Sequence, residues 1–237
     1  MKQLIIGLLA LATSLPLTAQ RIIEKNLDYK NQTIIEMEVK FASDIEVKTW
    51  DKQTVYFKAD LTTEDGKYLD QYDLDIREDN LRIEIASNAK KVFKKFQEER
   101  EKRNPGKKDY CCYDFDYEFN YTLYVPKNAR FTVSSINGNL TAELIEGEFS
   151  ADLINGDIEI QQYSGDLDLS TINGAIDLKM RNTTMTAETI HGNIYADEKL
   201  KLVSSERHVG QKVQGSFDNA DSSLRLNTIN GNMYLRL

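Results

Sequence analysis

The segment "SSINGNLTAELIEGEFSADLINGDIEIQQYSGDLDLSTINGAIDL", residues 134–178, carries a glycine every nine residues and Ile-Asn-Gly at every second glycine. The glycines fall at 138, 147, 156, 165 and 174, and Gly192 resumes the count after Thr183. An apolar residue stands two positions after each glycine, and polar residues alternate with apolar ones on either side. Alternation with period two in constant phase predicts short strands, each with one buried face and followed by a tight turn.

A register kept over 18 residues favours a coil over a series of hairpins, because each strand would then return to the same position one turn later. Strands stacked this way run parallel, about 4.8 Å apart. We therefore predict an all-β fold, a single-stranded parallel β-solenoid with about 18 residues per turn.

The recurring Ile-Asn-Gly is expected at one corner of this coil. We expect Ile136, Ile154 and Ile172 to point inward. Asparagine side chains stacked one turn apart can hydrogen-bond to one another, and glycine suits a corner that needs positive φ. The predicted structural ladder comprises Asn137, Asn155, Asn173, His191, Gly138, Gly156, Gly174 and Gly192.

The remainder of the chain is less regular. Residues 20–130 are expected to form an N-terminal β region that caps the coil, and residues 131–237 form the regular β-solenoid. Residues 88–109 predict a short charged helical insertion, with Val92, Phe93 and Phe96 docked on the body. Between residues 90 and 108, nine Lys or Arg stand against three Glu. A solvated insertion is favoured, and a basic contact for anionic envelope polymers or lipid head groups is the alternative.

Residues 1–19 have one Lys, a short apolar run and small residues before position 20, which predicts a signal peptide. We expect an exported protein without a transmembrane span, in the periplasm, on the outer-membrane surface or secreted. The net charge of −8 argues against a nucleic-acid partner. Adjacent cysteines rarely bridge each other, so Cys111 and Cys112 are expected to be free thiols, with an intermolecular disulfide as the alternative.

The sequence points to no catalytic, cofactor-binding or metal-binding residues, and no cofactor is expected. His191 occupies a ladder position, and no Ser-His-Asp or Cys-His arrangement can be drawn. A calcium site formed by the acidic residues is the alternative to a purely structural role, although the Gly-Gly-x-Gly-x-Asp units of calcium-binding coils are missing. These residues are Asp157, Asp166, Glu159 and Asp177. The chain ends in a strand that we expect to be exposed or used for pairing.

Three segments carry a resemblance to a known family: Tyr-Thr-Leu-Tyr-Val-Pro-Lys-Asn-Ala (121–129), the reiterated Ile-Asn-Gly-Asn/Asp, and Leu-Asn-Thr-Ile-Asn-Gly-Asn-Met-Tyr-Leu-Arg (226–236). Together they resemble the bacterial putative-adhesin β-strand-repeat family of unknown function, and they are similar to the adhesin head domains called GIN. The resemblance implies an exported β-solenoid with a role at the cell surface, and it supplies no catalytic residues.

We therefore expect a non-enzymatic β-solenoid protein of the cell envelope, with adhesin-like binding or scaffolding as its function and a glycan or protein as its ligand. A carbohydrate-active β-helix enzyme is one alternative. A structural protein that stacks end to end through its terminal strand edge is the other.

Overall fold

The computed structural model describes residues 20–30, 33–103, 115–181, 183–205, 209–217 and 220–237. The predicted signal peptide, the two cysteines and residues 104–109 of the insertion lie outside these ranges. The described part is built mostly of β-strands, with a single α-helix. The predicted all-β class is confirmed.

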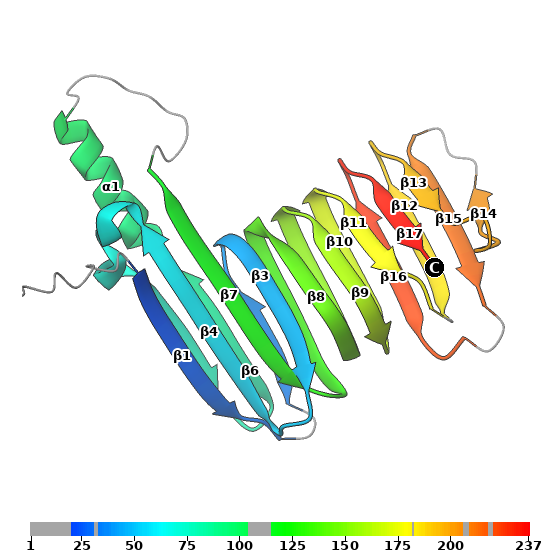
Figure 1. Ribbon diagram of the computed structural model, residues 1–237, viewed down its shortest axis with the longest axis horizontal. Coiled ribbons are helices and arrows are strands. Elements are labelled where there is room, and N and C mark those ends of the chain that lie inside the picture. Colours follow the sequence, from blue (N-terminus) through cyan, green and yellow to red (C-terminus); the bar gives the residue numbers. More distant parts are fainter. Residues whose placement is uncertain (1–19, 31–32, 104–114, 182, 206–208, 218–219) are drawn as a thin grey trace, which may run out of the picture.

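All the strands belong to one large mixed sheet. Paired strands follow one another in two rows, which we call the first and second layers. The first layer runs from one end of the molecule to the other (Figure 1) in the order β1 (Gln20–Asp28), β4 (Thr54–Thr63), β7 (Tyr117–Pro126), β3 (Phe41–Trp50), β8 (Ala129–Asn155), β9 (Ile158–Ser164), β11 (Ile176–Lys179), β17 (Met233–Arg236) and β13 (Ile194–Ala196). The β1–β4 and β4–β7 pairs are antiparallel and the remaining pairs of this layer are parallel.

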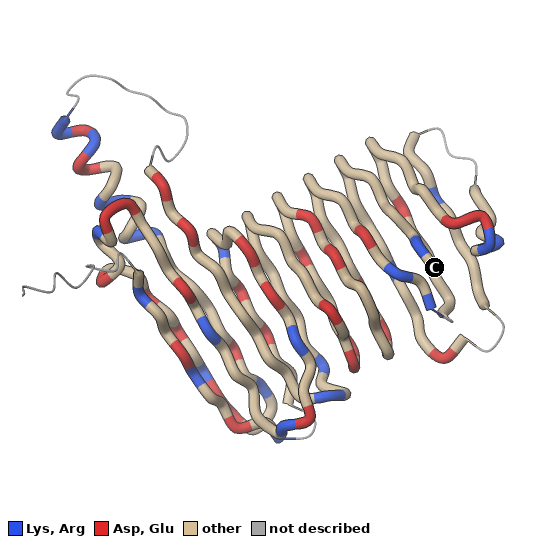
Figure 2. Tube along the Cα trace, in the orientation of Figure 1, with Lys and Arg blue, Asp and Glu red and all other residues tan. Residues whose placement is uncertain are grey.

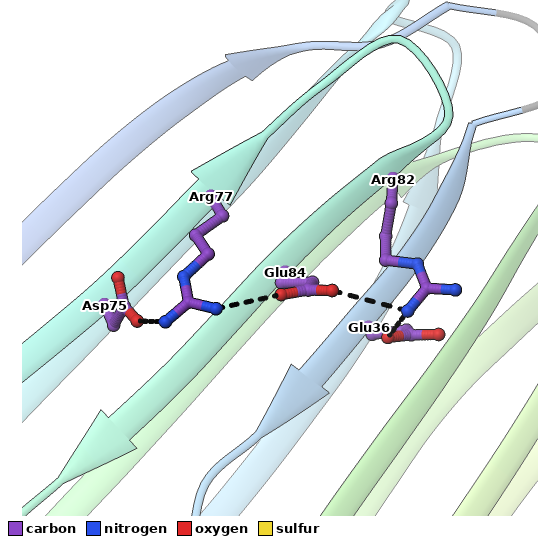
Figure 3. Close-up of polar contacts among 5 residues, drawn as sticks. All are labelled: Glu36, Asp75, Arg77, Arg82 and Glu84. Atoms are coloured by element: carbon purple, nitrogen blue, oxygen red, sulfur yellow. Dashed lines mark hydrogen bonds and ion pairs between the residues drawn. The ribbon is translucent and has the colours of Figure 1, made fainter.

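The second layer shares the long strand β8, which turns a corner and contributes to both rows. Its order is β5 (Asp73–Glu78), β6 (Arg82–Asn88), β2 (Ile34–Glu38), β8, β10 (Leu167–Asn173), β16 (Ser223–Thr228), β12 (Thr184–Thr189), β15 (Gln211–Ser216) and β14 (Val203–Ser205). On β5, β6 and β2, ion pairs link Asp75, Arg77, Glu84, Arg82 and Glu36 in series (Figure 3).

The 18-residue register is present in the middle of the stack. Leu140 lies opposite Ile158, which lies opposite Ile176, and Phe149 lies opposite Leu167. Antiparallel pairs flank this region at both ends. The finer prediction of a single parallel coil is therefore not confirmed for the chain as a whole.

The last rung of the stack is also out of chain order. Strand β16 lies between β10 and β12, and β17 lies between β11 and β13. The segments 167–178, 185–196 and 224–235 share alternating apolar positions around a Thr-Ile-Asn/His-Gly corner, so the last segment is equivalent to its neighbours and fits between them. The terminal strand β17 is consequently paired on both sides, with β11 and β13. Of the two expectations for this strand, the exposed one is wrong, and the strand is used for pairing within the chain.

The core is a single cluster of buried apolar side chains that extends from Leu27 to Leu235. The positions two residues after the periodic glycines are buried as predicted, at Leu140, Phe149, Ile158, Leu167 and Ile176, and so is Met185, two residues after Thr183. Ile194, on the end strand β13, is half-buried. Strand β8 crosses residue 130, where the sequence predicts a domain boundary.

Helix α1 (Lys90–Arg103) stands at the β1 end of the molecule (Figure 1), preceded in the chain by the short helical turns η1 (Glu64–Gly66) and η2 (Leu69–Gln71). Val92, Phe93 and Phe96 are buried, as the sequence predicts. The first half of the helix carries only lysines among its charged residues, and acidic and basic residues are mixed in the second half (Figure 2). Several pair, such as Lys95 with Glu98 at 3.0 Å. Within the described residues, no helix has the length and apolarity needed to cross a membrane.

Candidate functional site

Three of the predicted ladder residues are hydrogen-bonded in series. The Nδ2 amide of Asn155 donates to Oδ1 of Asn137 at 3.1 Å, and Nδ2 of Asn173 donates to Oδ1 of Asn155 at 2.9 Å. Each residue is 18 positions from the next. These amides lie at the solvent-facing corner of the stack, where they tie neighbouring rungs to one another.

His191 does not follow Asn173 in this ladder. Nδ2 of Asn230 donates to Oδ1 of Asn173 at 2.8 Å, and the backbone N–H of His191 donates to the carbonyl of Ile229 at 2.7 Å. The prediction that His191 stacks on Asn173 is wrong because the rung of Asn230 lies between them. Asn230, which the sequence-based ladder omits, belongs to it.

The glycines of the Ile-Asn-Gly corner are required mainly for close packing. A Cβ atom added at Gly156 would lie 2.0 Å from the carbonyl oxygen of Gly138, and one added at Gly174 would lie 1.9 Å from that of Gly156. Gly138 has φ +110, but Gly156, Gly174 and Gly192 do not have positive φ. The left-handed conformation instead recurs at the alternate corner, at Gly147 and Gly165.

The isoleucines of this corner face solvent, so the prediction that they point inward is wrong. Ile154 is 40% exposed and Ile172 is 38% exposed, while Ile136 is half-buried. The residue before each isoleucine points inward instead. Thr171 is buried, and its hydroxyl donates to the carbonyl of Gly156 at 2.9 Å.

A threonine or serine precedes isoleucine at 135, 171, 189 and 228, and this was the available sequence signal. The threonine hydroxyls at 189 and 228 make the same bond to the carbonyls of Gly231 and Gly174, at 3.1 Å each. The corner unit is therefore Thr-Ile-Asn-Gly, with the threonine rather than the isoleucine turned inward. These features describe the architecture of the corner.

Two of the acidic residues considered for calcium, Asp157 and Asp166, accept hydrogen bonds from the backbone of the next rung. Oδ1 of Asp157 accepts from the N–H of Ala175 at 2.7 Å, and Oδ1 of Asp166 accepts from the N–H of Ser223 at 2.7 Å. Asp177 forms an ion pair with Arg236. Among the residues that the structure describes, no three His, Cys, Asp or Glu side chains are grouped in a way that could hold a metal ion.

A different surface is more suited to binding. Trp50, Tyr56 and Tyr124 lie on β3, β4 and β7, and we call them the aromatic platform. Tyr56 and Tyr124 are directly opposite each other, and Tyr124 is opposite Lys48. The ring centroids of Trp50 and Tyr124 are 4.9 Å apart and those of Tyr56 and Tyr124 are 5.6 Å apart. All three rings are half-exposed on the outer side of the first layer.

Polar contacts hold these rings in place. Nε1 of Trp50 donates to the carbonyl of Thr54 at 2.8 Å, and the hydroxyl of Tyr56 donates to Oε1 of Glu24 at 2.9 Å. Desolvation raises the pKa of Tyr56, and the bond to Glu24 adds to this rise. The fixed rings form a preorganised apolar surface with hydrogen-bonding groups at its edge.

Two lysines stand over the platform. Nζ of Lys52 lies 4.5 Å from the ring centre of Trp50, and Nζ of Lys48 lies 5.5 Å from that of Tyr124. Lys48 also pairs with Glu46 at 2.7 Å, and the hydrogen bond between them raises the pKa of Lys48. Both ammonium groups can donate to a ligand that rests on the rings.

Sequence reasoning missed the aromatic platform. Phe119, Tyr121, Leu123 and Val125 form the buried face of β7. Tyr124 belongs to the opposite face of that strand, and Trp50 and Tyr56 are separated from it by more than sixty residues. The only signal was the presence of a large aromatic residue at an outward position of each strand.

No family model matches the sequence, and no curated protein does. Solved structures that match this chain include a putative cell adhesion protein from Clostridium sporogenes, 11% identical over 92% of this chain and 99% of that chain, with a TM-score of 0.49. Putative adhesins from Bacteroides fragilis and Parabacteroides distasonis are each 8% identical over 91% of this chain and 97% of theirs, with TM-scores of 0.30 and 0.27. Similarity at this level does not identify a ligand or an activity.

Proposed function

We propose that this protein is an exported, non-enzymatic β-solenoid protein of the cell envelope that binds a surface ligand through the aromatic platform. The observation that carries the proposal is the set of three fixed, half-exposed rings on adjacent strands. Tryptophan and tyrosine supply large rigid contact areas at low cost in conformational entropy, which is why they dominate binding surfaces.

The position of the platform on a rigid sheet supports binding rather than a moving catalytic site. Val47, Val55, Phe57 and Leu123, on the inner side of the same strands, are fully buried. The rings therefore cannot shift without disturbing the core. Such a surface recognises a ligand by shape and stacking with little rearrangement on either side.

The alternative of a structural protein that stacks end to end requires a free edge on the terminal strand β17. β17 pairs with β11 and β13 and offers no free edge. At that end β13 is the last strand of the first layer, and the side chain of Gln211 accepts from the N–H of Ile194 at 2.8 Å. A side chain that occupies an edge N–H hinders the addition of another strand.

A glycan and protein-ligand array, followed by a hydrolysis screen of every retained glycan, tests the proposal. We expect retention of at least one ligand without turnover, and we expect Trp50→Ala to weaken it about tenfold or more. Ile172→Ala is the matched control, because it removes exposed apolar surface away from the platform. Turnover of a retained glycan would overturn the non-enzymatic assignment, and undiminished retention by the Trp50 variant would overturn the platform.

A further inference from the structure

A second aromatic pair lies on the same layer as the platform, near the opposite end of the stack. Tyr195 on β13 and Tyr234 on β17 are directly opposite each other, with ring centroids 5.4 Å apart and planes inclined by 10°. Tyr195 is 51% exposed. Stacked rings on an end strand add little to a core, so their exposed faces are available to a ligand.

A continuous row of outward side chains connects this pair to the platform. Neighbouring strands place the following residues opposite one another in turn: Lys58, Thr122, Glu46, Thr141, Glu159, Asp177, Tyr234 and Tyr195. The row passes one strand pleat from Tyr56, Tyr124 and Lys48. From β7 to β17 the row crosses five strand spacings, which corresponds to about 24 Å.

The chemistry of the row selects the class of ligand. Glu46, Glu159 and Asp177 present carboxylate oxygens, which accept hydrogen bonds but cannot donate them. They favour a partner rich in hydroxyl groups. Because Glu46 is paired with Lys48 and Asp177 with Arg236, the repulsion of an anionic partner comes mainly from Glu159. A protein partner fits poorly, since the centre of a protein interface is depleted in charged residues.

A shallow pocket interrupts the row beside Asp177. It has a volume of about 200 Å³ and is lined by Glu159, Gln161, Asp177, Lys179 and Arg236, together with Ile160. Donors and acceptors therefore converge on one hollow between the two aromatic sites. A hydroxyl-bearing ring that enters it can both donate to the carboxylates and accept from the amide or the cations.

We propose that the first layer binds an extended neutral polysaccharide that runs across the strands, stacking on the aromatic platform at one end and on Tyr195 and Tyr234 at the other. The inference rests on the proposed binding function and adds the ligand class, the direction of the chain and a second contact. Pyranose rings combine apolar C–H faces with hydroxyl edges, which match aromatic faces and carboxylate acceptors respectively.

Two separated contacts make the affinity depend on ligand length. A disaccharide reaches one aromatic site at a time, whereas a chain that spans about 24 Å engages both, and the second contact then forms at high effective concentration. We expect the longer chains of one neutral series to bind at least about tenfold more tightly than its disaccharide.

The experiment measures calorimetric affinities for cello-, xylo-, manno- and chito-oligosaccharides from the disaccharide upward, with oligogalacturonate as the anionic comparison. The variants are Trp50→Ala and Tyr195→Ala, with Ile190→Ala as a control that is 46% exposed and also near the β13 end. Far-ultraviolet circular dichroism establishes that each variant is folded.

We expect Tyr195→Ala to reduce long-chain affinity to about that of the disaccharide, to leave disaccharide binding unchanged and to match wild type in fold. We expect Trp50→Ala to weaken both lengths, Ile190→Ala to weaken neither, and oligogalacturonate to bind more weakly than any neutral series that binds. Two results would overturn the spanning site while leaving the platform in place. One is that the Tyr195 variant binds long chains as tightly as wild type does. The other is that wild type binds long chains no more tightly than the disaccharide. No binding by any neutral series overturns the polysaccharide ligand and leaves the platform to the array experiment. A neutral series that binds Trp50→Ala as tightly as wild type overturns both the spanning site and the platform.

Discussion

Asn173 and Asn230 are hydrogen-bonded neighbours at 2.8 Å although 57 residues separate them in the chain. The equivalent corner residue of the intervening coil, His191, lies one rung farther on. The order of rungs in space therefore differs from their order in the sequence.

Cysteine crosslinking tests this order. In a chain with Cys111→Ser and Cys112→Ser, the pair Asn173→Cys and Asn230→Cys should form a disulfide on mild oxidation, because adjacent rungs place Cα atoms about 5 Å apart. The pair Asn173→Cys and His191→Cys should remain reduced, since two rungs exceed the reach of a disulfide. Mass spectrometry of the digested protein reports both results, and the reverse outcome would restore the sequential coil.

The direction of the corner side chains can be tested by a pair of substitutions at adjacent residues. Thr171→Val keeps the shape of the side chain but removes the hydroxyl that donates to Gly156, so it should lower the free energy of unfolding by about 1–2 kcal/mol. Ile172→Ser, at an exposed position, should change it by less than about 0.5 kcal/mol. Urea unfolding measures both, and a larger loss at Ile172 would contradict the observed orientation.

The close approach of neighbouring corners predicts that Gly174 tolerates no side chain. In Gly174→Ala, the new Cβ would meet the carbonyl oxygen of Gly156 at 1.9 Å, and relief requires two rungs to separate. We expect a loss of about 3 kcal/mol or more, at the upper end for overpacked sites. Asp168→Ala, on the exposed side of β10, serves as the control for a change on the same rung, and thermal unfolding of the two variants provides the comparison.

Asp177 predicts a dependence of stability on pH. Burial raises its pKa above the ordinary value of 3.8; Glu159 also raises it, whereas Arg236 opposes the rise. The folded state then holds the proton more tightly than the unfolded state, so stability falls as pH rises from 3.8 through the higher folded pKa.

Asp177→Asn removes this titration and should become more stable relative to wild type across that window, with the difference retained at neutral pH. Urea midpoints measured from about pH 3 to pH 7 follow the difference. Asp168→Asn provides the comparison at an exposed residue of β10. A gap between wild type and the Asp177 variant that does not change with pH would refute the expected coupling.

The local pattern predicted the strand class well because alternation depends only on which side of a strand each residue faces. Leu140, Ile158 and Ile176 are buried and stacked for this reason. Alternation fails at a corner, where the backbone turns and the phase changes by one residue. The pattern therefore predicts Ile172 in the core in place of Thr171. In the structure Thr171 points inward, and its hydroxyl donates to the carbonyl of Gly156.

The order of the strands in space could not be predicted from the same alternation. Residues 167–178 and 224–235 have equivalent sequences, so nothing local specifies which segment neighbours which. The aromatic platform is a similar case, because Trp50, Tyr56 and Tyr124 become neighbours only when the order β4–β7–β3 is known. Pairing between distant strands, rather than the character of any one strand, created both features.

The insertion of β16 and β17 between earlier rungs also constrains how the chain can fold. The corner of Ile190 and His191 attaches to the stack through residues 228 and 229, and β13 does so through β17. A chain that emerges with its N-terminus first cannot add rungs in the order of synthesis, because the place of β12 and β13 depends on residues made later. Completion of this end must wait for β16 and β17, and β12 and β13 stay accessible to chaperones and proteases until then.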